Sequence, residues 1–321
     1  MNGAQVHIAG SGSSKAVEVR EITKSFEGQE VLKAISFVVP KGEIFGIIGP
    51  DGAGKTTLFR ILTTLLLADS GEAVVAGDDV VRDFKSIRSK VGYMPGRFSL
   101  YPDLSVEENL KVFASIFNTS VEENYDLIKD IYGQIEPFKK RRAGALSGGM
   151  KQKLALSCAL IHKPEVLFLD EPTTGVDPVS RKEFWDMLYK LKKEGITILV
   201  STPYMDEASR CDRIALIQGG SFLKIDAPQE IIDQYEKTLW AVKAKAMYPL
   251  LKDLRALSYV DTCFAFGDSH HVTIKSEALN DPTRNLTPEI LRHDLDEKGH
   301  REIEIAPIRA GIEDCFMELA G

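Results

Sequence analysis

The chain has 321 residues, enough for one large and one small hydrophobic core. Hydrophobic residues make up 44% and charged residues 27%, values ordinary for a globular protein. The formal net charge of −7 argues against a generic nucleic-acid-binding surface, and no apolar run reaches the roughly 18 residues that span a bilayer.

The first 15 residues contain Gly and Ser but no apolar segment. They therefore predict a mobile tail rather than a secretory signal peptide. The four cysteines, Cys158, Cys211, Cys263 and Cys315, lie 52 or 53 residues apart, which suits neither a metal site nor a redox motif. We expect reduced and mostly buried thiols.

The first part of the chain has the pattern of an α/β unit. Residues 17–22 alternate between apolar and polar, and 31–39 continue this strand pattern. The near-continuous apolar run 43–49 predicts a buried strand, and a glycine-rich stretch and a helix from Lys55 follow it. Further strand-like pieces occupy 72–76 and 90–94.

The glycine-rich stretch GPDGAGKT, residues 49–56, fits the pattern G-x-x-x-x-G-K-[ST]. Glycines let successive backbone N–H groups turn toward a phosphate, and the following helix directs its positive end at the same anion. Lys55 adds a cation for the β- and γ-phosphates, and Thr56 offers a hydroxyl to Mg²⁺. The predicted nucleotide-binding residues are Gly49, Pro50, Asp51, Gly52, Ala53, Gly54, Lys55, Thr56 and Thr57.

A mainly helical pattern occupies residues 105–162. The sequence SVEE occurs at 105–108 and again at 120–123. In both places Ser at the N-cap and Glu three residues later predict a capping box at the start of a helix.

Two carboxylates follow the next predicted strand. The strand consists of four apolar residues, 166–169, followed by Asp170, and Glu171 comes directly after it. Since α/β sheets bind ligands at the carboxyl ends of their strands, we expect both side chains beside the phosphate loop. Asp170 would belong to the Mg²⁺ shell, and Glu171 would orient or deprotonate the attacking water. Further on, Asp177 is placed to cap a helix that starts at Pro178.

The remaining pattern indicates a second domain. The apolar run 196–200 predicts a buried strand, and 213–218 and 221–226 predict a hairpin over a Gly-Gly turn. From about 237 strand-like and helical stretches start anew, which indicates a small separate α+β domain. The expected division is a flexible tail at 1–15, an α/β domain at 16–236 with a helical part at 105–162, and an accessory domain at 237–321.

The motif LSGGMKQK, which opens a predicted helix, resembles the signature sequence of the ABC ATPases. The matching residues are Leu146, Ser147, Gly148, Gly149 and Met150. The order of phosphate loop, signature, aspartate–glutamate strand and a D-loop at 175–178 is similar to this family over about 17–230. The resemblance implies a P-loop ABC ATPase domain, an α/β fold with a mixed-sheet core and a helical signature subdomain.

In ABC ATPases two nucleotide domains pair head to tail, and each ATP lies between the phosphate loop of one and the signature of the other. The resemblance therefore implies that Ser147, Gly148 and Gly149 contact a γ-phosphate held by a partner domain. It also implies that Phe26 stacks on adenine, with core packing as the alternative. Asp177 matches the D-loop aspartate, although its position equally suits a helix cap.

The stretches GPDGAGKTTL, GVDPVSRKEFW and IEDCFMELAG resemble ATPases of ABC-2-type exporters, the drug-resistance and multidrug group. This implies ATP and Mg²⁺ as cofactors and separate integral membrane permease subunits as partners. A second nucleotide-binding domain is also implied, and no nucleic acid is expected. The implied location is peripheral, at the cytoplasmic side of the cell (inner) membrane.

Two positions depart from the family pattern. Pro203 stands where the family has a histidine that contacts the γ-phosphate and the attacking water, and proline offers no side-chain donor or acceptor. Gly96 stands where the family has a glutamine. Nucleotide binding is therefore expected to be intact, whereas hydrolysis at this chain's own site is in doubt.

The expected function is that of an ATPase that drives an exporter. The alternatives are an ATP-binding but hydrolysis-deficient partner in an asymmetric heterodimer, a non-transport ABC protein, and an importer ATPase. For the pairing, a heterodimer is preferred over a homodimer because of Gly96 and Pro203. The basic run 139–142 is expected to be a solvated face, with phospholipid or nucleic acid as the alternative contact. His270 and His271 are expected in a strand rather than at a metal.

Overall fold

The computed structural model describes residues 15–279 and 286–321 and divides the chain into two compact units, with the boundary between Pro228 and Gln229. The expected tail lies outside the described residues, apart from Lys15, where the first strand begins. The boundary falls earlier than the expected 236/237. The reason is helix α7 (Pro228–Asp233), in which Ile231 is buried and its carbonyl accepts a hydrogen bond from Cys315 Sγ at 3.7 Å.

A six-stranded sheet forms the centre of the first unit. Its strands lie in the order β10-β9-β3-β8-β7-β6. Their bounds are β3 (Ile44–Ile48), β6 (Val91–Met94), β7 (Val166–Asp170), β8 (Thr197–Thr202), β9 (Arg213–Gln218) and β10 (Ser221–Asp226). Only the β9–β10 hairpin is antiparallel among these pairs. Every residue of β3, β7 and β8 is buried, which explains their continuous apolar runs.

An antiparallel sheet lies on the other side of helix α1 (Lys55–Leu62). Its order is β2-β1-β4-β5, with bounds β1 (Lys15–Phe26), β2 (Gln29–Pro40), β4 (Ser70–Val75) and β5 (Asp78–Asp79). One hydrophobic cluster joins both sheets to the helix, through residues such as Val19, Phe45 and Phe59. This shared core fixes the loop that runs from β3 into α1.

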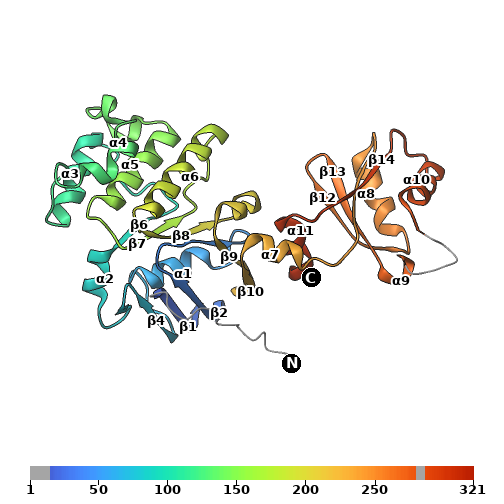
Figure 1. Cartoon of the computed structure of the whole chain (residues 1–321), viewed down its shortest axis with the longest axis horizontal. Helices are drawn as coiled ribbons and strands as arrows, with labels where there is room; N and C mark the ends of the chain where they lie inside the picture. The colour runs from blue at the N-terminus through green and yellow to red at the C-terminus, as the bar shows by residue number, and fades with distance from the viewer. Residues whose placement is uncertain (1–14, 280–285) are drawn as a thin grey trace. The chain divides into compact units, whose positions relative to one another are not determined.

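The helices of the first unit gather mainly on one side, where α3 to α6 lie together in Figure 1. The bounds are α2 (Phe84–Lys90), α3 (Val106–Ile116), α4 (Tyr125–Tyr132), α5 (Gly148–Leu160) and α6 (Pro178–Lys193), with 3-10 turns at Glu136–Phe138, Ala143–Ala145 and Met205–Arg210. The first SVEE forms the predicted capping box, with reciprocal hydrogen bonds between Ser105 and Glu108. The mixed-sheet core and the helical part confirm the predicted fold class.

The second SVEE does not start a helix directly. Ser120 and Glu123 form the same reciprocal hydrogen bonds, at 3.1 and 3.2 Å, but they close a turn. Asn124 donates its side-chain amide to Ile161 O at 2.6 Å, and this bond ties the turn to the end of α5. Helix α4 therefore begins only at Tyr125.

The second unit has an antiparallel sheet of its own, in the order β12-β13-β11-β14. The bounds are β11 (Leu239–Lys243), β12 (Val260–Phe266), β13 (Ser269–Ile274), β14 (Glu304–Ile308), α8 (Met247–Ala256), α9 (Ser276–Leu279), α10 (Pro288–Glu297) and α11 (Ile312–Ala320). A separate hydrophobic cluster, which includes Trp240, Leu254 and Leu291, joins the sheet to α8 and α10.

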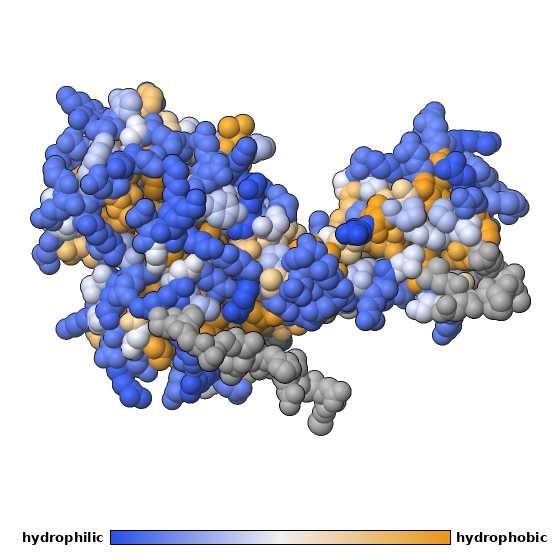
Figure 2. Space-filling view, viewed as in Figure 1, coloured by the Kyte–Doolittle hydropathy of each residue, from blue (hydrophilic) through white to orange (hydrophobic). Residues whose placement is uncertain are grey.

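Hydrophilic side chains predominate on the face shown in Figure 2, with smaller hydrophobic areas between them. Within the described part of the chain, no helix has the length and apolar character needed to cross a membrane. The four cysteines are buried and free, as the sequence predicts.

Candidate nucleotide-binding site

The predicted phosphate loop connects β3 to α1, and its glycines meet conformational demands. Gly52 and Gly54 have φ values of 79° and 104°, in the left-handed region that favours glycine. At Gly49, a Cβ would lie 2.1 Å from Ile217 O. Gly54 is also the N-cap of α1 and supplies no side-chain cap, and the first turn has no acidic residue. The first N–H groups of α1 are thus suited to an anion.

Lys55 connects this loop to the carboxyl end of β7. Its side chain is only 3% exposed, and Nζ donates to Gly49 O at 2.8 Å and to Pro50 O at 3.0 Å. Nζ also lies 3.3 Å from Glu171 Oε1. The structure thus brings the predicted phosphate-binding cation and the predicted water-activating carboxylate into direct contact.

Asp170 and Glu171 lie at the carboxyl end of β7, where β7 pairs with β8. Asp170 is 2% exposed, and its Oδ1 accepts a hydrogen bond from Ser201 Oγ at 2.6 Å. Burial raises the pKa of Tyr93 to about 12, and the negative charge of Asp170 contributes to this shift. Asp170 and the Thr56 hydroxyl are hard oxygen donors, a set that fits Mg²⁺.

The other predicted nucleotide contacts differ in exposure. Asp51 is exposed and Thr56 is half-buried, whereas Ala53 is buried. Phe26 ends β1 and leaves 45% of its surface exposed, with Lys24 Nζ 5.5 Å from the ring centroid. The exposed ring is available for stacking, in contrast to the core-packing alternative.

The predicted signature lies beside the D-loop and the first turn of α6 in the same chain. Ser147 is the N-cap of α5 and accepts a hydrogen bond from Met150 N at 3.4 Å. A Cβ on Gly149 would lie 3.0 Å from Ser180 Oγ, in the first turn of α6. Asp177 caps that helix by accepting from the N–H groups of Val179 and Ser180. The D-loop aspartate therefore has the capping role that its position suggested.

The signature does not take part in the local phosphate site. None of the hydrogen bonds or ion pairs found among the described residues joins Ser147, Gly148 or Gly149 to residues 49–57. Leu146 is buried, whereas Ser147 and Gly148 are exposed. The two predicted parts thus remain separate within one chain.

The two departures from the family pattern come shortly after β6 and β8, the strands on either side of β7. A Cβ on Gly96 would lie 3.0 Å from Asp170 O and 3.7 Å from Glu171 Cβ, so this glycine is beside the two carboxylate-bearing residues. Pro203 directly follows β8, and the Tyr204 ring after it stacks under Arg181, 4.3 Å from the guanidinium carbon.

Two polar residues of this region, Ser201 and Glu207, were not predicted as site residues. Ser201 contacts both carboxylate-bearing residues, through Asp170 Oδ1 and through Glu171 N. Glu207 is 2% exposed and accepts hydrogen bonds from Thr173 Oγ1 at 2.7 Å and Trp185 Nε1 at 3.2 Å. Both lie in the stretch STPYMDEA around Pro203, where polar residues directly after a buried strand were the available signal.

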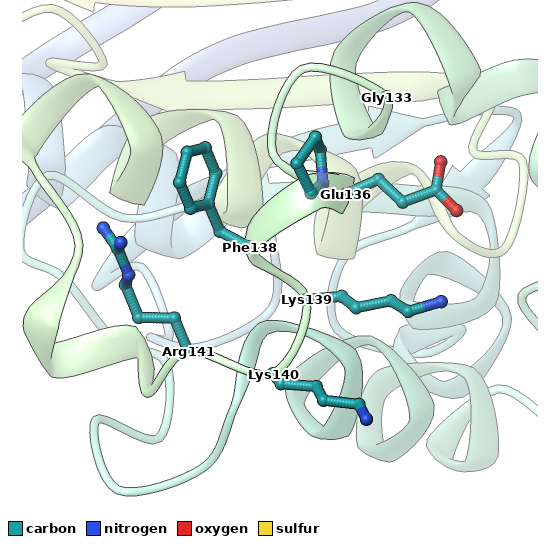
Figure 3. A pocket seen from close by; sticks show the side chains of 7 residues that line it. Gly133, Glu136, Phe138, Lys139, Lys140 and Arg141 are labelled. Atoms are coloured by element: carbon teal, nitrogen blue, oxygen red, sulfur yellow. The ribbon is translucent and has the colours of Figure 1, made fainter.

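The basic run 139–142 lies outside this site, on an exposed loop. Figure 3 shows the pocket beside it, where Lys139 and Lys140 extend to one side of the view and Arg141 extends to the other. Arg141 lies over the Phe138 ring at 4.6 Å. The pKa of Glu107 is lowered, first by its hydrogen bond to Lys111 and further by the charges of both lysines. Acidic neighbours thus offset part of the positive charge.

The histidine pair lies in β13 of the second unit. His270 Nε2 is 2.7 Å from Met247 O, and His271 Nδ1 is 2.7 Å from Asp314 Oδ1. Each imidazole therefore has a partner within the fold. No group of three or more side chains suited to a metal ion is found within the described residues.

Comparisons with known proteins agree with this geometry. Residues 32–174 match the family model described as ABC transporter. The chain is 36% identical over 311 residues to the probable multidrug ABC transporter ATP-binding protein YbhF of Escherichia coli (strain K12), an alignment that covers 95% of this chain and 52% of YbhF. The chain thus spans about half the length of that relative. It is also 36% identical over 308 residues to Nod factor export ATP-binding protein I of Burkholderia lata, with 95% of this chain and 97% of that protein covered.

Solved structures are similar over the first unit. The structure of cbiO1 from Clostridium perfringens, part of the ABC transporter complex cbiONQ, has a TM-score of 0.62 and 27% identity, and covers 68% of this chain and 91% of its own. The ATP-binding cassette MJ0796, in a dimeric post-hydrolysis state bound to ADP and Pi, has a TM-score of 0.60 and 26% identity. That match covers 66% of this chain and 98% of MJ0796.

Proposed function

We propose, from the premise that this chain belongs to the ABC transporter family of ATP-binding proteins, that it is the ATP-binding and ATP-hydrolysing subunit of an ABC-2-type exporter. Two nucleotide domains would close on ATP and so drive separate permease subunits from the cytoplasmic side of the inner membrane. Relatives named for multidrug transport and Nod factor export support the direction of transport. The observation that carries the proposal is the contact of Lys55, which follows the phosphate loop, with Glu171, which follows Asp170 at the carboxyl end of β7.

In this proposal the phosphate loop and the two carboxylates have separate roles. The N–H groups of residues 49–57 and Lys55 bind the phosphates of ATP, in place of the present contacts of Nζ with Gly49 O and Pro50 O. Asp170 and Thr56 would hold Mg²⁺, which would supply positive charge to neutralise the phosphates. Glu171 orients the attacking water and accepts its proton at a carboxylate oxygen. Phe26 stacks on the adenine.

The signature of this chain would act on the ATP of a partner domain. Ser147 and Gly148 are exposed, and the dipole of α5 points its positive end in their direction. Their separation from residues 49–57 supports head-to-tail pairing, because one chain alone then lacks a complete site.

Nucleotide measurements on the purified chain test this proposal. The chain should bind ATP more tightly with Mg²⁺ than with EDTA, and it should hydrolyse ATP when combined with its native membrane partners. Absence of ATP binding under both conditions would overturn the assignment of the phosphate loop. Binding without any membrane-bound partner in native purification would argue for a non-transport ABC protein.

A second candidate function is an ATP-holding subunit in an asymmetric heterodimer. Gly96 and Pro203 favour it, because Gly96 lies beside Asp170 and Glu171, Pro203 follows the strand that pairs with β7, and neither offers a polar side chain. A different partner domain would then carry the histidine and the glutamine. The signature of this chain would complete that competent site. Losing one water-orienting group commonly lowers the rate about 10²–10⁴-fold.

Two variants in the native complex distinguish these functions. In the asymmetric pair, Ser147→Arg should reduce total ATPase activity more than Glu171→Gln, because only the signature of this chain serves the competent site. In a pair with two competent sites, Glu171→Gln should remove much of the activity. Brisk ATP hydrolysis by a homodimer of this chain alone would also exclude the asymmetric candidate.

A further inference from the structure

Ser201 occupies the junction of three functional segments. It lies near the end of β8, between the two strands that carry the phosphate loop and the carboxylates. In the parallel pairing it stands opposite Asp170 on β7 and opposite Ile47 on β3. The side chain is completely buried. A buried hydroxyl at this place needs a hydrogen-bonding partner within the fold.

The hydroxyl finds that partner in the carboxylate proposed to hold Mg²⁺. Ser201 Oγ donates to Asp170 Oδ1 at 2.6 Å, a short distance typical of a hydroxyl bound to a charged carboxylate. Among the described residues, this is the side-chain hydrogen bond found for Asp170. Nearby Gly96 and Pro203 have no side-chain donor that could share this task.

The same serine also holds the peptide of Glu171. Glu171 N donates to Ser201 O at 3.0 Å and lies 3.1 Å from Ser201 Oγ. Glu171 has a φ of 49°, a left-handed conformation that non-glycine residues adopt at a cost. The two contacts with Ser201 supply binding energy that can offset this cost. They therefore fix the direction in which the carboxylate leaves the strand.

The next residue of β8 extends the connection to the phosphate loop. Thr202 O accepts a hydrogen bond from Gly49 N at 3.3 Å. The strand end thus contacts the first residue of the loop through Thr202, and both carboxylate-bearing residues through Ser201. A change in the hydroxyl of Ser201 would act on the carboxylates, while this backbone bond would remain.

We propose that Ser201 is a positioning residue that orients Asp170 for Mg²⁺ and holds Glu171 in its left-handed conformation. This inference rests on the proposed function, because it takes Asp170 as the Mg²⁺ ligand. Ser201 contacts neither nucleotide nor metal itself. Its effect should therefore appear in the Mg²⁺ dependence of ATP binding, because residues that orient metal ligands commonly change metal affinity about 10–100-fold.

The experiment compares Ser201→Ala, Ser201→Thr and Ser201→Cys in the full chain. ATP affinity is measured by displacement of trinitrophenyl-ATP, first with EDTA and then during a Mg²⁺ titration. Ser201→Ala should bind ATP normally in EDTA but need about 10–100-fold more Mg²⁺ for its tighter binding. Ser201→Thr restores the hydroxyl and should restore the wild-type titration. Ser201→Cys keeps a donor at the same position, although the thiol is a weaker donor and somewhat larger than the hydroxyl. This variant should fall between the other two, and it decides the matter if the alanine variant does not fold.

Ser157→Ala is the matched control. Ser157 is also fully buried, but its hydroxyl donates to Lys153 O within α5. The inference is wrong if Ser201→Ala has the wild-type Mg²⁺ titration, or if it loses as much affinity in EDTA as in Mg²⁺. It is also wrong if the threonine variant fails to restore the titration. If the wild-type chain binds ATP identically with and without Mg²⁺, the proposed metal role of Asp170 fails instead.

Discussion

Replacement of Lys55 by alanine tests the centre of the site most directly. The wild-type ammonium is buried and already has three partners, Gly49 O, Pro50 O and Glu171 Oε1, at 2.8, 3.0 and 3.3 Å. Binding of ATP would exchange the two carbonyl partners for phosphate oxygens. The alanine variant loses the phosphate contacts and leaves Glu171 without its cation.

The expected loss of affinity follows from this exchange. A hydrogen bond to a charged group contributes about 1.5–3 kcal/mol, and two such bonds to phosphate would give roughly 3–6 kcal/mol. The free chain already has two bonds from Nζ to neutral carbonyls, whose loss on binding offsets roughly 1–2 kcal/mol of that sum. The net loss for Lys55→Ala is therefore about 2–4 kcal/mol, or roughly 30–1000-fold in the dissociation constant of ATP.

Isothermal titration calorimetry with ATP and Mg²⁺ measures this change. Lys90→Ala is the control, because Lys90 Nζ is also bonded to a carboxylate, Asp78, at 2.7 Å and to a backbone carbonyl, Ala76 O, at 3.4 Å. The control should bind ATP with wild-type affinity. A change of less than about threefold in Lys55→Ala, or an equal loss in both variants, would refute the assignment of Lys55 to the phosphates.

Three further predictions concern stability and domain structure. Burial raises the pKa of Glu43 from 4.5 to about 7. The free energy of unfolding should therefore fall as the pH rises from 4.5 to about 7, because the folded state holds the proton more tightly. In urea titrations across this pH range, Glu43→Gln should remove about 2 kcal/mol of that decrease. Parallel curves for both proteins would contradict this. Glu207→Ala should lower the free energy of unfolding by about 3 kcal/mol, because Trp185 Nε1 and the Thr173 hydroxyl lose their buried acceptor. A loss below about 1 kcal/mol would contradict this role of Glu207. A chain cut after Pro228 should remain monodisperse in gel filtration and bind ATP, whereas aggregation would show that the second unit is needed for folding.

Much of the fold could be predicted because the chain carries strong local signals. The continuous apolar runs of β3, β7 and β8 gave the buried strands, and their parallel pairing follows from the helices between them. Asp177 before Pro178 gave the start of α6. The glycines of the phosphate loop predicted a tight turn, and Gly52 and Gly54 indeed have positive φ.

Other features depend on contacts between distant segments. The turn at Ser120 and Glu123 is set by the bond from Asn124 to Ile161 O, across 37 residues. The domain boundary depends on Cys315 and Ile231, which are 84 residues apart. Ser201 and Asp170 are separated by 31 residues, so their hydrogen bond was visible only once β7 and β8 were paired.

The loops that contain the two departures are held by partners of their own. Arg181 stacks on Tyr204 directly after Pro203, and Glu207 ties the same segment to Thr173, two residues after Glu171. The loop after β6 approaches Asp170 O so closely at Gly96 that a side chain there would need the backbone to shift by a few tenths of an ångström. None of these contacts needs a histidine or a glutamine. The positions of Asp170 and Glu171 depend instead on Ser201 and Lys55, which are intact. The residues proposed to bind ATP are thus present in this chain, whereas Gly96 and Pro203 lack the side chains that the family pattern uses at the attacking water. This difference is the physical basis for proposing that binding can persist where hydrolysis is slow.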